Sequence, residues 1–208
     1  MRELEKKLFR PKENMLDFNA LTGLAGIMKE YGVAGVRPAD GYLEFVGLEK
    51  DAAPAFEKEI QRWIVPVECS ARVVKACRGL KCRNGMGDAG KMAALLWEKI
   101  KDHHLPGKFR IGVSACPNNC AGGPVRDLGL FATARGWTVM AGGSAGRNPR
   151  LADRIASGLD DGQALELAES ILGAYIRLAG PKERIGALIR RTGTGEFSFL
   201  AGAGGEDQ

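Results

Sequence analysis

The residues best suited to chemistry are four cysteines arranged as two pairs. Cys77 and Cys82 stand in the segment ACRGLKC, and Cys116 and Cys120 stand in SACPNNC. The glycines and prolines around each pair let the backbone wrap a small volume on which four thiolates could converge. This arrangement indicates an iron–sulfur cluster. A zinc site is the alternative, although neither pair has the C-x2-C spacing typical of zinc.

The composition suggests where such cysteines would act. The chain has 208 residues, of which 45% are hydrophobic and 26% charged, as in an ordinary globular protein with one or two cores. No apolar run approaches the ~20 residues that span a bilayer, and the charged N-terminus lacks an apolar signal core. We therefore expect a cytoplasmic protein without a membrane partner, whose clustered cysteines bind metal rather than form disulfides. The fifth cysteine, Cys69, is expected to be a buried thiol.

The basic residues are scattered rather than grouped. The net charge is +5, yet no run of five or more Lys and Arg occurs, and the cations stand singly beside glycines, prolines and the cysteines. This pattern favours discrete pockets for small anions over a nucleic-acid-binding stripe.

Residues 1–66 are predicted to form a small α-β-β-α unit. Residues 1–15 are polar and are expected to be an arm or tail. The expected elements are a helix from Asp17 to Tyr31, strands over 33–37 and 42–46, and a helix capped by Asp51 that carries Phe56, Ile60 and Ile64 on one side. One face of the small sheet remains open and needs a partner layer.

Residues 67–200 are predicted to form the larger domain. Strands over 72–76 and 109–113 each deliver a cysteine pair, and a helix capped by Asp88 connects them. The remaining expected elements are strands over 128–134 and 137–141, a flexible glycine loop over 142–146, and helices over 164–176 and from Pro181 to about 191. The tail, 201–208, is expected to be disordered.

Four segments carry a resemblance to a known family. LPGKFRI at 105–111, SACPNNC at 114–120, DLG at 127–129 and GGSAGRNPR at 142–150 resemble motifs of the siroheme-containing sulfite and nitrite reductases. The chain holds one copy of the repeated unit, like the small single-repeat sulfite reductases. Its first pair, C-x4-C, is one residue shorter than the family's.

The resemblance implies a fold, cofactors and a reaction. It implies an α+β protein in which a ferredoxin-like half-unit packs on a mixed α/β siroheme and iron–sulfur domain. Cys77, Cys82, Cys116 and Cys120 would hold a [4Fe–4S] cluster, and Cys120 would also bridge to the siroheme iron. The implied reaction is six-electron reduction of sulfite. Nitrite reduction and a non-catalytic electron carrier or accessory subunit remain alternatives.

The resemblance also implies further site residues and partners. The residues expected to bind substrate or drive its reduction are Arg37, Arg72, Lys108 and Arg110. Siroheme contacts are expected from Lys108, Arg110, Asn118, Asn119, Cys120 and Arg147. Electrons would come from a ferredoxin-like donor, with no nucleic acid involved, and the single copy could pair as a homodimer.

Overall fold

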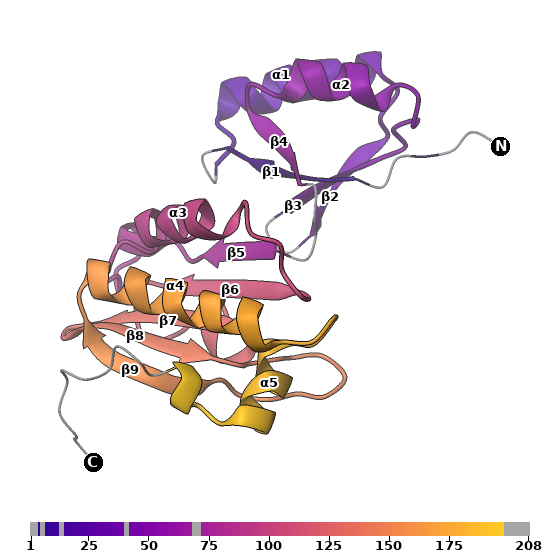
Figure 1. The fold of residues 1–208 in the computed structure, drawn as a ribbon. Coiled ribbons are helices and arrows are strands. Elements are labelled where there is room, and N and C mark those ends of the chain that lie inside the picture. The colour runs from indigo at the N-terminus through magenta and orange to yellow at the C-terminus, as the bar shows by residue number, and fades with distance from the viewer. Residues whose placement is uncertain (1–3, 5–6, 13–14, 40–41, 68–71, 198–208) are drawn as a thin grey trace. The chain divides into compact units, whose positions relative to one another are not determined.

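The computed structural model describes residues 4, 7–12, 15–39, 42–67 and 72–197. The chain divides into two compact units, residues 1–70 and 71–208 (Figure 1). The predicted buried thiol Cys69 and the predicted tail 201–208 lie outside the described residues. Within the described part of the chain, no helix is long and apolar enough to cross a membrane.

The first unit is a complete β-α-β-β-α-β arrangement. Its elements are β1 (Leu8–Pro11), α1 (Phe18–Glu30), β2 (Gly35–Ala39), β3 (Tyr42–Val46), α2 (Ala53–Ile60) and β4 (Ile64–Val67). The sheet order is β2-β3-β1-β4, and every pairing is antiparallel. This is the ferredoxin-like topology. The predicted α-β-β-α order is contained in it, but two flanking strands were missing from the prediction.

The missing strands have identifiable causes. Residues 8–11 were expected to belong to a polar arm, yet they form a central strand because Phe9 is fully buried and packs edge-on against Phe45, with 5.2 Å between ring centroids. Ile64 was expected on a helix but begins β4, since α2 ends at Ile60. The predicted Asp51 cap is also wrong. The N-cap of α2 is Ala52, without a side-chain hydrogen bond, and a proline stands in the first turn.

The second unit is built on a five-stranded mixed sheet. The strands are β5 (Arg72–Ala76), β6 (Phe109–Ser114), β7 (Leu128–Thr133), β8 (Gly136–Ala141) and β9 (Asp153–Leu159), paired in that order. β5, β6 and β7 are parallel, and β8 and β9 continue antiparallel. The helices are α3 (Ala89–Ile100), α4 (Asp161–Leu178) and α5 (Ile185–Thr192), with short 3-10 turns η1 (Gly79–Lys81), η2 (Gly123–Val125) and η3 (Gly195–Phe197).

Side chains alternate between the two faces of this sheet. On β6, Phe109, Ile111 and Val113 are fully buried in the core that α3 and α4 cover (Figure 1). Arg110 and Gly112 therefore lie on the opposite face. The predicted Asp88 cap is confirmed, because its Oδ1 accepts from the Lys91 backbone N–H at 3.0 Å. The strand β9 was not predicted, and α5 begins at Ile185 rather than at Pro181.

Candidate functional site

Parallel strand pairing brings the two cysteine loops together. Ala76 and Val113 are partners in the β5–β6 register, so both strands deliver their cysteines at the same edge of the sheet. The Sγ of Cys77 accepts hydrogen bonds from the backbone N–H groups of Ala115 (3.1 Å) and Gly79 (3.4 Å). The N–H of Met86 donates to the carbonyl of Ala115 at 2.7 Å. These bonds join the first loop to the second.

The second cysteine pair occupies a tight turn that is held against the sheet. Asn119 has a positive φ of 51°, and its N–H donates to the Cys116 carbonyl at 3.2 Å. The turn continues into η2, which approaches the sheet at glycines. A Cβ at Gly129 would lie 2.5 Å from the carbonyl oxygen of Gly123, so a side chain there would push the turn away. Cys116 is 7% exposed, whereas Cys120 faces solvent.

All four described cysteines are free thiols. Among the residues that the structure describes, no three His, Cys, Asp or Glu side chains gather as ligands of a single metal ion. A [4Fe–4S] cluster makes a different demand, because each thiolate binds its own iron at a separate corner. Two adjoining cysteine loops with N–H donors aimed at sulfur suit that demand.

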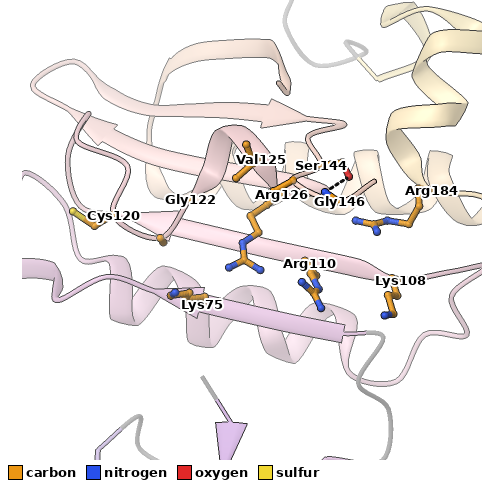
Figure 2. Close-up of a pocket in the computed structure, with 12 residues that line it drawn as sticks. Lys75, Lys108, Arg110, Cys120, Gly122, Val125, Arg126, Ser144, Gly146 and Arg184 are labelled. Atoms are coloured by element: carbon orange, nitrogen blue, oxygen red, sulfur yellow. Dashed lines mark hydrogen bonds between the residues drawn. The ribbon is translucent and has the colours of Figure 1, made fainter. Parts of the chain in front are cut away.

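A cationic pocket adjoins the second cysteine loop. It has a volume of about 410 Å³ and is lined by Lys75, Lys108, Arg110, Cys120, Ala121, Gly122, Val125, Arg126, Ser144, Ala145, Gly146 and Arg184. Figure 2 shows Cys120 at one end of this group and Lys108 and Arg184 at the other. Among the described residues that line the pocket, five are cations and none is acidic. The pocket is therefore suited to a ligand with several negative charges.

A buried carboxylate holds one of these cations. Asp127 is fully buried and receives two hydrogen bonds from Arg184, Nε to Oδ1 at 2.8 Å and Nη2 to Oδ2 at 2.6 Å. The backbone N–H of Arg110 also donates to Asp127 Oδ2, at 2.9 Å. The bidentate pairing fixes the guanidinium plane of Arg184 beside β6. Asp127 thus offsets part of the positive charge that Arg184 brings to the pocket.

Only some of the predicted site residues line the pocket. Lys108, Arg110 and Cys120 line the pocket. Asn118 is exposed in the cysteine turn, and Asn119 directs its Nδ2 to the Pro117 carbonyl at 3.1 Å. Arg147 is exposed and follows the lining residue Gly146 without lining the pocket itself.

Two further predicted residues are not among the described residues that line the pocket. Arg72 begins β5, and its side chain is outside the described part of the structure. Arg37 belongs to β2 of the first unit, where its Nη1 pairs with Glu44 Oε2 at 2.8 Å. The glycine segment 142–146, expected to be flexible, is tethered by hydrogen bonds between Ser144 and Arg150 in both directions at 2.8 Å.

The prediction from the sequence did not include three cations that line the pocket, Lys75, Arg126 and Arg184. Strand alternation could have found Lys75, because it pairs with Gly112 beside Arg110 on the face opposite the core. Arg126 directly precedes the DLG motif, and this position could have indicated a role at the site. Arg184 is 57 residues from its partner Asp127, and no local pattern indicates that contact.

Comparison with known proteins decides the family. The model of the nitrite and sulphite reductase 4Fe-4S domain matches residues 69–202. The chain belongs to this family. It is accordingly an oxidoreductase, and the matched segment contains both cysteine loops and every pocket residue.

Individual relatives differ in how much of their length this chain covers. An assimilatory-type sulfite reductase of Nitratidesulfovibrio vulgaris is 29% identical over 182 residues, which is 86% of this chain and 84% of that protein. The nitrite reductase [NAD(P)H] large subunit of Klebsiella oxytoca is 36% identical over 116 residues, 55% of this chain but only 12% of that protein. The solved structure of dissimilatory sulfite reductase I has the same fold, with a TM-score of 0.82, 12% identity and coverage of 96% of this chain and 69% of that one.

Proposed function

We propose that the protein reduces sulfite to sulfide at a siroheme bound in the cationic pocket and coupled to a [4Fe–4S] cluster. One observation carries the proposal: Cys120, alone among the four described cysteines, lines the pocket. A thiolate at that position would serve both the cluster and the siroheme. Electrons would then reach the substrate site through a single shared sulfur atom.

The residues present fit siroheme by charge. Siroheme carries eight carboxylates, and Lys75, Lys108, Arg110 and Arg126 offer charge-assisted donors from the described lining of the pocket. When bound, siroheme would supply an iron that can bind the substrate and pass electrons to it. Asp127 would hold the guanidinium of Arg184 in a fixed orientation toward one edge of the siroheme, because Arg184 donates two hydrogen bonds to this carboxylate.

The remaining cysteines fit cluster ligation. Cys77, Cys82 and Cys116 would serve the cluster alone, while Cys120 serves both groups. The two N–H bonds to Cys77 Sγ would delocalise its thiolate charge and make the cluster easier to reduce. Cys116, which is buried in the loop that follows β6, would complete the set.

Sulfite reduction needs cations that hold oxygen atoms and deliver protons. Six electrons and seven protons convert SO₃²⁻ to HS⁻ and three waters. Lys108 is exposed and can exchange protons with solvent, so we propose it as the proton relay. The guanidinium of Arg110 would orient the sulfite oxygens as S–O bonds break.

Sulfite is the first candidate substrate because the sulfite reductase of Nitratidesulfovibrio vulgaris is matched over 84% of its length. Nitrite is the second candidate, supported by the 36% identity to the Klebsiella oxytoca nitrite reductase subunit. A ferredoxin-like donor, a cytoplasmic location and a homodimer belong to the same proposal. So do roles for Arg37, Arg72, Asn118, Asn119 and Arg147 at the haem or substrate.

The test is to purify the protein after co-expression of siroheme synthesis and measure three quantities. We expect a siroheme Soret band and a band in the red, four acid-labile sulfides per chain, and HS⁻ production from sulfite with reduced methyl viologen. Faster turnover of nitrite than of sulfite at equal concentration would favour the second candidate. A colourless protein with stoichiometric zinc would contradict the proposal.

A further inference from the structure

We infer that the loop spanning residues 78–86 is the docking surface for a small acidic one-electron carrier protein. The inference rests on the proposed function, in that it assumes a [4Fe–4S] cluster on Cys82 and its three partners. It adds the place where electrons enter and the surface chemistry of the protein that brings them.

The 78–86 loop presents an unbalanced positive charge. Arg78, Lys81 and Arg83 are all exposed, and no Asp or Glu occurs between residues 72 and 87. Within the part of the chain that is described, these three side chains form no ion pair with a carboxylate. Asp88 follows the loop, but its Oδ1 caps α3 through the Lys91 N–H. The free cations are complementary to a carrier with a carboxylate-rich surface.

The same loop exposes two large apolar side chains. Leu80 is 63% exposed and Met86 is 55% exposed. They stand on either side of Cys82 along the chain, and Lys81 and Arg83 directly flank that cysteine. A small apolar centre with a charged rim is the composition of transient electron-transfer interfaces, which bury little area. The partner would therefore contact residues next to a cluster ligand.

The loop is held rigidly despite its exposure. The Cys82 N–H donates to the Gly79 carbonyl at 3.0 Å, and the Gly85 N–H donates to the Cys82 carbonyl at 2.9 Å. A Cβ at Gly85 would lie 2.6 Å from the Gly79 carbonyl oxygen, so the turn is closely packed. A preformed surface loses little conformational entropy when a partner docks.

The electron transfer is a simple exchange. One electron leaves the reduced cluster of the carrier and enters the [4Fe–4S]²⁺ cluster, which becomes [4Fe–4S]⁺, and no bond forms or breaks. The test probe is a photoreduced plant-type [2Fe–2S] ferredoxin, and the reference reductant is photoreduced 5-deazariboflavin, which is small and uncharged. Stopped-flow absorbance of the holoprotein gives the rate of cluster reduction by each.

Charge reversal tests the cations. In the triple variant Arg78→Glu, Lys81→Glu, Arg83→Glu, the second-order rate with ferredoxin should fall at least about tenfold at low ionic strength. The matched control is Arg154→Glu, Arg177→Glu, Arg190→Glu, which makes the same change in net charge on β9, α4 and α5. The rate of the control should stay within about twofold of the wild-type rate. Added salt should lower the wild-type rate towards that of the loop variant.

A second pair of variants tests the apolar centre. Leu80→Ala should weaken ferredoxin binding about threefold to tenfold, whereas Leu151→Ala, at 70% exposed, should leave it unchanged. Reduction by 5-deazariboflavin should be the same in all variants. The inference would be overturned if both triple variants slowed cluster reduction by ferredoxin equally. It would also be overturned if the only effect of the loop substitutions were dissociation of a homodimer, measured by sedimentation.

Failure of the inference is separable from failure of the proposed function. If viologen-driven HS⁻ production persists while ferredoxin reduces the loop variant at the wild-type rate, the docking surface is wrong and the enzyme assignment stands. If no HS⁻ forms but loop reversal slows cluster reduction by ferredoxin, the docking surface stands and the enzyme assignment fails.

Discussion

The two faces of the five-stranded sheet are built from the same strands and serve different purposes. On β6, Ile111 is fully buried under α3 and α4, while its neighbour Arg110 lines the cationic pocket on the other side. A strand places successive side chains on opposite faces, so one segment can supply both core packing and ligand binding. Substitutions on the two faces should therefore separate loss of stability from loss of cofactor or activity.

The largest effect is expected from Cys120→Ala, on the pocket side. Removing the thiolate that we propose the cluster and haem share should abolish their coupling and lower sulfite turnover at least about a thousandfold, equivalent to about 4 kcal/mol. Siroheme content, labile sulfide and viologen-driven HS⁻ production measure the result. Cys69→Ala is the control and should retain both cofactors. Equal cofactor loss in both variants would make the ligand assignment wrong.

The core face is tested by Ile111→Ala. Truncating this fully buried side chain should lower the free energy of unfolding by about 2–5 kcal/mol, because it leaves a cavity under the helices. Denaturant titration of the holoprotein gives the change. At low temperature the folded fraction should still hold siroheme and reduce sulfite. A variant that is as stable as wild type but loses siroheme would contradict the proposed division of roles between the two faces.

The neighbouring substitution Arg110→Gln tests the pocket face of the same strand. Loss of the charge should weaken siroheme retention or raise KM for sulfite about tenfold to a hundredfold. The free energy of unfolding should change by less than about 1 kcal/mol, since the side chain is only partly buried and its backbone bond to Asp127 remains. Arg110→Lys should recover part of the function. Unfolding as severe as that of Ile111→Ala would contradict the comparison.

The smallest effect concerns Tyr175, which is fully buried on the core side. Burial, with the nearby Asp127 charge, raises the pKa of Tyr175 to about 12. The folded protein thus keeps this proton to higher pH than the unfolded chain, whose tyrosine titrates near 10, so stability is lost as pH rises between those values.

Tyr175→Phe should remove that part of the alkaline destabilisation, which is at most about 2–3 kcal/mol. At neutral pH it should cost about 1 kcal/mol, because the hydroxyl donates to the Glu183 carbonyl at 2.6 Å. Denaturant titrations at neutral and alkaline pH measure both. A wild type and variant with parallel stability profiles above pH 10 would contradict the assignment.

Features that depend on residues close in sequence were predicted, whereas features that depend on contacts between distant residues were not. The resemblance to the family's motifs indicated Lys108, Arg110 and Cys120, which the structure brings to one pocket. Local periodicity placed α1, α3 and α4, each with a strong apolar face and a capping aspartate. The four-residue strands β1 and β4 were missed, since four residues are too few to show alternation. Arg184 failed because its role depends on a contact with Asp127 that only the folded chain creates.

The most direct test of the central claim is a Mössbauer spectrum of the oxidised holoprotein enriched in ⁵⁷Fe. If Cys120 is shared, the unpaired spin of the ferric siroheme must reach the cluster, and we expect magnetic splitting at the cluster irons. Cys120→Ala should remove this splitting. A wild-type cluster that gives only an unsplit, diamagnetic doublet beside an independent haem signal would contradict the shared thiolate.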